Sequence, residues 1–227
     1  MSIALIILAA GKGTRMDSDL PKVLHKIGGA PLLHHAMLSA SALEPDRTIV
    51  VTGHGAEMVE AAARDFDPDA IAVRQEEQLG TGHAVKQAQD ALDGFDGDLI
   101  MLYGDTPFIT TETLEAMIAA RATHDVVVLG FEAADPARYG RLIMDGSGLS
   151  QIVEYKDASD EERAVTFCNS GVICANAATF MDLVSAVGND NAAGEYYVTD
   201  IVGIAKERGL KATAVACDEA ETLGINS

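Results

Sequence analysis

The segment Leu8-Ala-Ala-Gly-Lys-Gly-Thr-Arg15, followed by Leu20-Pro-Lys22, joins an apolar run near the amino terminus to a loop with two glycines and three cations. Backbone N–H groups in a loop of this kind can surround a phosphate, while the side chains of Lys12, Arg15 and Lys22 supply countercharge. The composition of this segment therefore predicts a binding site for a phosphate-rich ligand.

The charge of the whole chain makes these cations more informative. The 227 residues carry 16 Lys and Arg against 35 Asp and Glu, a net charge of −19, whereas residues 1–26 hold four of the cations and only two of the carboxylates. A surface this acidic repels nucleic acid and anionic membranes, which predicts a small polyanionic ligand bound near the amino-terminal loop. Selection for solubility explains the overall charge equally well, but it does not account for the local reversal.

Length and composition favour one α/β domain over residues 1–227. The apolar run 3–10 has no basic segment before it and is too short to span a membrane, so it predicts neither a signal peptide nor a membrane helix. The three cysteines form no C-x-x-C pair, which is typical of a reduced cytoplasmic protein.

Apolar runs alternate with helical periodicity in residues 1–132, the pattern of a mostly parallel sheet covered by helices on both faces. The expected strands are 3–8, 48–52, 71–74, 99–103 and 126–131. The expected helices are 32–43, 56–65, 82–92 and 111–124.

The regular alternation of expected strands and helices ends at residue 132, and residues 133–227 show a different pattern. Segments 139–144 and 149–153 flank Asp145-Gly-Ser-Gly148 and predict a hairpin. A strand at 167–175, helices at 177–187 and 199–208, and a last strand at 211–216 are expected to follow. The charged segment 157–163 is predicted to be a solvated surface loop. The domain thus divides into a nucleotide half, 1–132, and a mixed, hairpin-bearing half, 133–227.

Two common nucleotide fingerprints do not fit the amino-terminal loop. Met16 stands where a dinucleotide motif has its third glycine, and the second strand ends in Val51-Thr-Gly-His54 without an acidic residue for a ribose. A P-loop would need Gly-Lys-Ser/Thr at the end of a glycine-spaced segment, which the loop lacks. Neither NAD binding nor P-loop ATPase chemistry is expected.

Five motifs in order along the chain carry a resemblance to a known family. They are the loop with its Pro-Lys, Gln75-Glu-Glu-Gln-Leu-Gly-Thr-Gly-His-Ala84, Leu102-Tyr-Gly-Asp-Thr-Pro107, Tyr139-Gly-Arg141 with Glu154, and Asn169-Ser-Gly171 with Gly194-Glu-Tyr-Tyr-Val-Thr-Asp200. Together they resemble the uridyltransferase domain of the bacterial bifunctional N-acetylglucosamine-1-phosphate uridyltransferases and glucosamine-1-phosphate acetyltransferases.

The resemblance implies a Rossmann-like nucleotidyltransferase fold and a Mg²⁺-dependent reaction. The phosphate of N-acetylglucosamine 1-phosphate attacks the α-phosphorus of UTP, which yields UDP-N-acetylglucosamine, a cell-wall precursor, and pyrophosphate. Phosphoryl transfer mainly requires positioning and charge neutralisation, so cations and a metal matter more than a general base.

The resemblance also assigns roles on the nucleotide side. Arg15 and Lys22 are expected to be catalytic, placed on the transferring phosphates. The expected nucleotide-binding residues are Leu8, Ala9, Ala10, Gly11, Lys12, Gly13, Gln75, Gly80, Thr81, Tyr103 and Gly104. The alternative role for Thr81 is that of N-cap of the helix expected at Gly82.

On the other side of the reaction, the resemblance implies that Gly140, Glu154 and Asn169 bind the sugar and that Asp105 and Asn226 bind Mg²⁺. Asp105 directly follows an apolar strand, at the edge where open α/β sheets bind ligands. The alternative role for Asp105 is that of a helix cap near residues 106–111. The six histidines lack zinc-site spacing and are expected to be ordinary core or surface residues.

The chain ends at Ser227, where the family continues into an acetyltransferase β-helix. Acetyl transfer is therefore not expected, and the family's trimer is not assumed. Two alternatives stay open: a nucleotidyltransferase for a different sugar 1-phosphate, and a non-catalytic sensor that binds a UDP-sugar.

Overall fold

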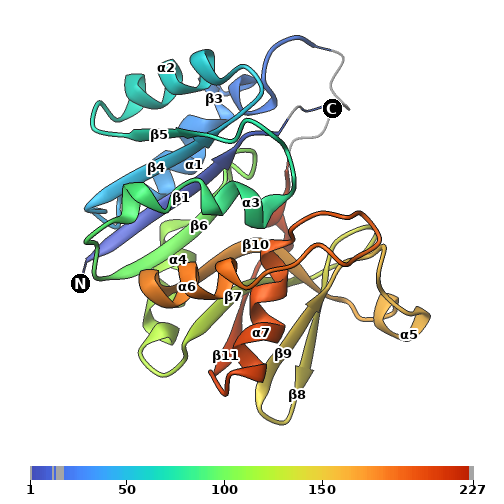
Figure 1. Ribbon diagram of the computed structural model, residues 1–227. Coiled ribbons are helices and arrows are strands. Elements are labelled where there is room, and N and C mark those ends of the chain that lie inside the picture. The colour runs from blue at the N-terminus through green and yellow to red at the C-terminus, as the bar shows by residue number, and fades with distance from the viewer. Residues whose placement is uncertain (1, 12, 14–17, 225–227) are drawn as a thin grey trace.

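A nine-stranded sheet organises the computed structural model, which describes residues 2–11, 13 and 18–224 (Figure 1). Seven strands follow the order β11-β7-β10-β6-β1-β4-β5, and β8 joins through β10 and pairs with β9. The strands are β1 (Ile3–Ala9), β4 (Arg47–Thr52), β5 (Ile71–Arg74), β6 (Asp98–Tyr103), β7 (Val126–Glu132), β8 (Arg141–Asp145), β9 (Gly148–Val153), β10 (Phe167–Asn176) and β11 (Ala212–Cys217).

Strand β1 lies in the centre of the sheet because all seven of its side chains are apolar and buried. It pairs in parallel with β4 on one side and with β6 on the other. Continuous apolar runs of this kind form strands covered on both faces, as the sequence predicts. The edge strand β5 is less buried, since its end residues Ile71 and Arg74 are exposed.

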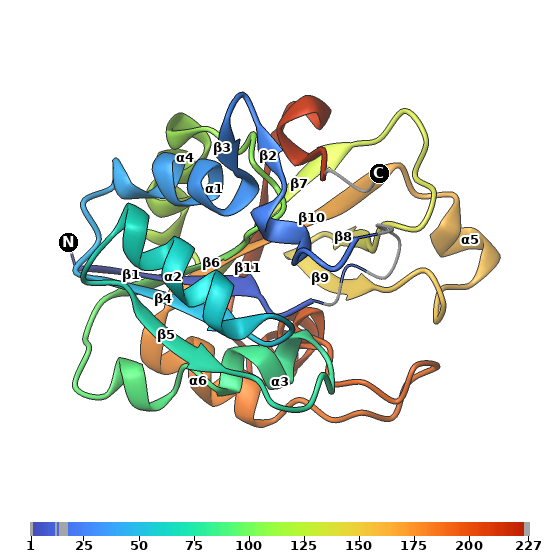
Figure 2. The same cartoon turned by 90° about the horizontal axis from the view of Figure 1, so that it is seen from above.

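Helices cover both faces of the sheet (Figure 2). Helices α1, α2 and α4 pack on one face through residues such as Met37, Val59 and Leu114. Helices α3, α6 and α7 pack on the other, where Phe180 is fully buried. Their bounds are α1 (Leu32–Ser41), α2 (Ala56–Phe66), α3 (Thr81–Lys86), α4 (Thr111–Arg121), α6 (Ala177–Ser185) and α7 (Ile201–Glu207). None of the helices in the described residues combines the length and apolarity that a membrane crossing requires.

The two halves of the chain share this one sheet. Strand β10 runs antiparallel between β6 of the first half and β7, while β11 is parallel to β7. The hairpin of β8 and β9 extends from this end of the molecule (Figure 1) and contacts β10 where Arg141 is the register partner of Cys168. The predicted mostly parallel sheet, with helices on both faces and a hairpin in the second half, is thus confirmed.

Short elements complete the connections. They are the two-stranded sheet of β2 (Lys26–Ile27) and β3 (Ala30–Pro31), the short helix α5 (Asp160–Arg163), and the 3-10 helices η1 (Lys22–Leu24), η2 (Asp90–Leu92), η3 (Val198–Asp200) and η4 (Glu219–Thr222).

Two predictions about local structure are wrong. Segment 157–163 is not simply a loop, because it includes α5, which begins with a capping box: Ser159 accepts from the Glu162 N–H, and the Glu162 carboxylate accepts from the Ser159 N–H. The single helix expected over 82–92 is instead α3 followed by a turn and η2. Apolar periodicity continues through that turn and hides the break.

Arg141 fixes the irregular chain that precedes β8. Its side chain is 2% exposed, and its guanidinium donates to the carbonyl oxygens of Pro136, Ala137, Tyr139 and Arg163. A buried guanidinium can supply five N–H donors, so a single side chain satisfies carbonyls from the segment before β8 and from the last residue of α5. Arg141 thereby holds the segment 136–140 in place.

We expect Arg141→Leu to lower the free energy of unfolding by about 3 kcal/mol, because it leaves several buried carbonyls without donors. Urea denaturation of both proteins measures the difference. Arg208→Leu is the matched control: Arg208 is exposed and pairs with Asp182, so its loss should change stability by less than about 1 kcal/mol. Equal effects of the two substitutions would contradict the role given to Arg141.

Candidate functional site

The carboxyl ends of the parallel strands gather the predicted nucleotide residues at one edge of the sheet. Leu8 of β1 and Tyr103 of β6 are register partners, and the Gly104 N–H donates to the Leu8 carbonyl at 3.0 Å. Gln75, directly after β5, donates its backbone N–H to the carbonyl of Thr52 at the end of β4, at 2.8 Å. Parallel pairing thus places residues far apart in sequence side by side.

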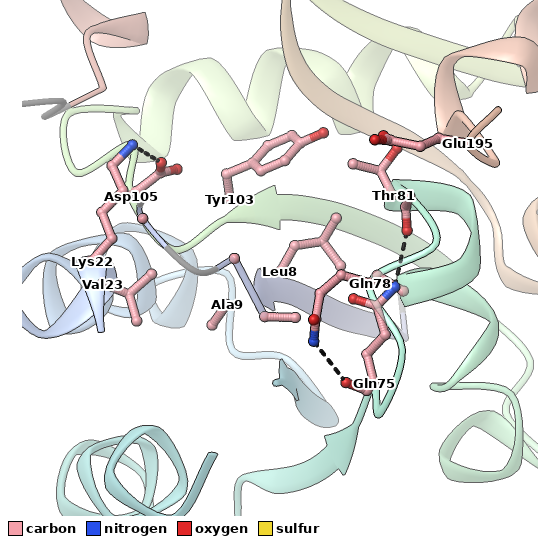
Figure 3. A pocket seen from close by; sticks show the side chains of 15 residues that line it. Leu8, Ala9, Lys22, Val23, Gln75, Gln78, Thr81, Tyr103, Asp105 and Glu195 are labelled. Atoms are coloured by element: carbon pink, nitrogen blue, oxygen red, sulfur yellow. Dashed lines mark hydrogen bonds and ion pairs between the residues drawn. The ribbon is translucent and has the colours of Figure 1, made fainter. Parts of the chain in front are cut away.

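A cavity of about 390 Å³ opens on this edge (Figure 3). The sequence-predicted residues that line it are Leu8, Ala9, Ala10, Gly11, Gly13, Lys22, Gln75, Gly80, Thr81, Tyr103 and Asp105. Four further lining residues were not predicted: Val23, Gln78, Ala84 and Glu195. Lys12 and Arg15 lie outside the described residues.

Lys22 and Asp105 form an ion pair at one end of this cavity (Figure 3). The Lys22 Nζ lies 2.5 Å from the Asp105 Oδ2, and the two side chains are 14% and 25% exposed. Gly13 makes room for the lysine, because a Cβ at this position would lie 2.9 Å from the Lys22 Cβ, and its φ of +58° favours glycine. This ion pair therefore joins η1 to the chain that follows β6, and Gly13 of the amino-terminal loop packs against it.

The loop before α3 is fastened to the second half of the chain. The Gly82 N–H donates to the Tyr196 carbonyl at 2.7 Å, and the Tyr196 N–H donates to the Leu79 carbonyl at 2.9 Å. Gly80 allows this approach, since a Cβ there would lie 2.5 Å from the Tyr196 oxygen. The Gly194–Asp200 motif thus supports the nucleotide side of the cavity through its backbone.

Thr81 and Asp105 do not have the capping roles that were their alternatives. Helix α3 begins at Thr81 itself, and the Thr81 hydroxyl accepts a hydrogen bond from the Val198 N–H at 3.0 Å. Helix α4 is capped by Thr110, whose hydroxyl accepts from the Thr113 N–H. Thr81 and Asp105 therefore line the first cavity, and neither acts as a helix cap.

His83 contacts Gln75, which lines the first cavity. Its Nδ1 lies 3.0 Å from the Gln75 Nε2, and its Nε2 lies 3.3 Å from the Gln87 Nε2. The prediction of an ordinary core or surface histidine does not anticipate this contact with a residue that lines the cavity. Its only sequence signal was its place within the Gln75–Ala84 motif.

A second cavity, of about 280 Å³, continues from the first and shares Lys22, Tyr103 and Asp105 with it. It is also lined by all three predicted sugar-binding residues, Gly140, Glu154 and Asn169. Its lining residues that were not predicted are Thr106, Arg138, Tyr139, Ser170, Gly171, Thr222 and Gly224. The charged pair thus lies where the two cavities meet.

Internal hydrogen bonds orient the residues of the second cavity. Asn169 donates its backbone N–H to the Gly140 carbonyl at 2.8 Å, and its Oδ1 accepts from the Gly171 N–H at 2.9 Å. The Glu154 Oε1 accepts from the Thr199 hydroxyl at 3.0 Å. Thr199 belongs to the Gly194–Asp200 motif, but its contact with Glu154 spans 45 residues and leaves no local signal.

Burial and negative charge act on the titrating groups of this cavity. Burial raises the pKa of the Glu154 carboxyl above its ordinary value, the bond from Thr199 opposes this, and the charges of Asp200 and Asp157 add to the rise. Burial together with the charges of Glu154 and Asp105 raises the pKa of the Tyr103 phenol. Tyr103 therefore stays neutral and can donate a hydrogen bond.

The Asp105 carboxylate suits the magnesium ion that the resemblance implies. It is an oxygen ligand, it is reachable from both cavities, and Mg²⁺ in such enzymes takes few protein ligands and completes its shell with phosphate oxygens and water. The described residues contain no cluster of three or more His, Cys, Asp or Glu arranged for a metal. Asn226, the second predicted ligand, lies outside the described residues, although Gly224 lines the second cavity.

Comparisons with solved structures agree on the fold. A UDP-glucose pyrophosphorylase complexed with UDP-glucose superposes with a TM-score of 0.75 at 18% identity, over 95% of this chain and 91% of that one. An inositol-1-phosphate CTP transferase from T. maritima gives 0.73 at 16% identity, over 95% and 86%. These structures establish an α/β nucleotidyltransferase fold.

Sequence comparison gives closer relatives. A protein of Ruegeria pomeroyi named Bifunctional protein GlmU is 65% identical over 227 residues, and a protein of the same name from Paracoccus denitrificans is 56% identical over 225 residues. The alignments cover 100% and 99% of this chain but 50% of each relative, so the chain spans about half their length. The family model of the MobA-like NTP transferase domain matches residues 5–172. Because this match covers most of the chain, including Lys22, Gln75 and Asp105, the chain belongs to the family of MobA-like NTP transferase domains.

Proposed function

We propose that this chain is a Mg²⁺-dependent nucleotidyltransferase that joins UTP and N-acetylglucosamine 1-phosphate to give UDP-N-acetylglucosamine and pyrophosphate. The observation that carries the proposal is the position of the Lys22–Asp105 pair between the two cavities. A ligand that fills both cavities has its middle at this pair, and in a nucleotide sugar the middle is the phosphate chain. The 65% sequence identity to a protein named Bifunctional protein GlmU supports this reaction over those of other nucleotidyltransferases.

On the nucleotide side, the first cavity offers the groups that a uridine needs. The backbone from Leu8 to Gly11 faces the ligand, and Gln75 and the Gly80-Thr81 segment supply polar atoms for the edge of the base. Lys22 supplies positive charge to the phosphates in a protein that is otherwise strongly acidic. Arg15 and Lys12 are proposed to add to this charge.

On the sugar side, Glu154 and Asn169 supply acceptors and donors for hydroxyl groups, and Gly140 lets the sugar approach the backbone. The attacking phosphate is already ionised at neutral pH, so the reaction needs no general base. The protein orients this phosphate toward the α-phosphorus and neutralises the developing charge.

Asp105, with Asn226, would hold the Mg²⁺. When bound, the ion neutralises phosphate charge and helps to align the reacting groups. Free buried thiols at Cys168 and Cys174 fit a reducing compartment, so we place the activity in the cytoplasm.

Release of pyrophosphate tests the proposal directly. The chain is incubated with UTP, Mg²⁺ and each of a panel of sugar 1-phosphates, and the highest kcat/KM is expected with N-acetylglucosamine 1-phosphate. A higher value with another sugar would assign the chain to a different sugar nucleotide. UDP-sugar binding by calorimetry without turnover in either direction would make it a sensor.

We expect Arg15→Ala to lower kcat by about 100-fold or more with little change in nucleotide affinity, because its charge is needed mainly in the transition state. Steady-state kinetics and calorimetric titration with UTP measure the two effects. Lys26→Ala is the matched control, since Lys26 is an exposed cation of the same segment and lines neither of the two cavities. A kcat that stays at the wild-type value in the Arg15 variant would remove this residue from the mechanism.

The raised pKa of Glu154 predicts that the stability difference between wild type and a Glu154→Gln variant depends on pH. Its pKa is raised in the folded protein, so the folded state binds this proton more tightly than the unfolded state does. Ionisation of Glu154 therefore lowers the free energy of unfolding. This loss is absent at pH values below the ordinary pKa of the carboxyl and complete at pH values above its raised pKa. Glu154→Gln should raise the melting temperature relative to wild type at about pH 8, and the gain should shrink toward about pH 4.

Melting curves at several pH values measure this gain. The same variant should have a higher KM for the sugar phosphate, because a neutral amide is a weaker acceptor than a carboxylate. Glu161→Gln, at an exposed carboxylate of α5, is the control and should change neither quantity. A gain in melting temperature that is independent of pH would contradict the assignment to Glu154.

A further inference from the structure

The Gln75 side chain has both of its donor hydrogens committed inside the protein. Its Nε2 lies 3.0 Å from the Gly80 carbonyl oxygen and 3.0 Å from the His83 Nδ1. A carboxamide nitrogen carries two N–H groups, so these contacts use both. Gln75 is only 3% exposed, yet it lines the nucleotide cavity, where Figure 3 shows its amide beside the loop at Thr81. What the amide can offer a ligand is its oxygen, an acceptor.

The Gly80 carbonyl determines which end of the amide is nitrogen. Reversing the Gln75 amide would place its Oε1 against the Gly80 oxygen, and two acceptors repel each other. The His83 Nδ1 must therefore accept from Gln75, which assigns the ring proton to Nε2. Gln87 lies 3.3 Å from this Nε2, and its amide also donates to the His83 backbone carbonyl at 3.0 Å. Because Gln87 is half-buried, it can give up that bond to solvent and turn its amide to accept the ring proton, whereas a turn of the buried Gln75 would leave the Gly80 oxygen without a donor.

We infer that His83 is a positioning residue that fixes the Gln75 amide with its oxygen toward the ligand, so that the site selects a pyrimidine with a proton on N3. The inference rests on the proposed function and adds to it the device that selects the base. Uracil carries a hydrogen on N3 and can donate it to the Gln75 Oε1. Cytosine has a lone pair at N3, which would face the same oxygen and be repelled.

A purely structural role for His83 predicts a different pattern. The ring also lies near Tyr196, with the two ring centroids 6.5 Å apart, so its removal could simply loosen the support of the loop. Loss of packing would weaken UTP and CTP alike. Loss of positioning would weaken UTP and change the preference between the two bases, because an amide held by the Gly80 carbonyl alone can rotate about that one hydrogen bond and present its freed N–H group to the ligand.

The experiment compares full-length wild type, His83→Leu and His83→Asn with UTP and CTP, at saturating Mg²⁺ and N-acetylglucosamine 1-phosphate. The Leu variant removes the acceptor from one Gln75 N–H and should reduce both kcat/KM for UTP and the UTP:CTP preference by roughly tenfold or more, mainly through KM. The Asn oxygen can take the place of Nδ1, so the Asn variant should recover most of the preference. Calorimetric Kd values for both nucleotides give the same ratios without turnover.

His34→Leu is the matched control, since His34 is also a half-buried helix histidine and its Nε2 contacts the Ala62 carbonyl oxygen at 2.8 Å, on α1 and away from the cavity. It should keep the wild-type preference. A Leu variant at 83 with an unchanged UTP:CTP ratio, or an Asn variant that loses as much as the Leu variant, would overturn the inference.

A measurement on wild type covers the case in which the Leu variant does not fold. Nitrogen-15 chemical shifts of the His83 ring should show a protonated Nε2 and an unprotonated Nδ1, and the opposite tautomer would overturn the inference. A wild type with this tautomer that binds no uridine nucleotide would instead overturn the proposed function and, with it, the selection of uracil.

Discussion

The parallel pairing of β1 with β4 and β6 is the constraint on which the site depends. Because the side chains of β1 are all buried, the strand cannot leave the centre of the sheet without exposing apolar surface to water. Its position brings the chain after Ala9, the end of β4 and the end of β6 to one edge. Leu8, Gln75 and Asp105 are far apart in sequence and line one cavity because these strands end together.

A second requirement is that the two halves of the chain stay in register with each other. Strand β10 provides this through its pairing with both β6 and β7, and the contacts of Gly80 and Gly82 with Tyr196 add a second connection beside the cavity. The two cavities therefore lie on one continuous sheet, with the Lys22–Asp105 pair where they join. A reaction that transfers a group between two substrates needs such a fixed geometry, since small misplacements are costly.

The sequence predicts the central strands well, because apolar runs such as 3–8 and 99–103 have few other stable states in a domain of this size. It predicts the members of the cavity through the resemblance, in order along the chain. Long-range contacts leave no comparable signal: Gly80 with Tyr196, Glu154 with Thr199, and Arg141 with the carbonyls around it join residues by geometry alone. Helix α5 shows a different cause of error, since Ser159 and Glu162 do form a capping-box pattern, but the many charges around them are equally typical of a loop.

Some polar groups of the site have their hydrogen bonds made within the protein, and others keep capacity for a ligand. The first kind fixes the geometry of the site, and the second kind binds. The Thr81 hydroxyl, the Asn169 oxygen and the Gln75 nitrogen all take part in bonds within the protein, so their geometry is set before a ligand arrives. An ammonium has three donors and a carboxylate has several acceptor positions, so the bond between Lys22 and Asp105 does not exhaust either group. Each can keep the other in place while it also meets a phosphate or a metal ion. The ion pair places the two opposite charges of the site next to each other. Their attraction offsets part of the desolvation free energy of each partly buried charge until the phosphates bind.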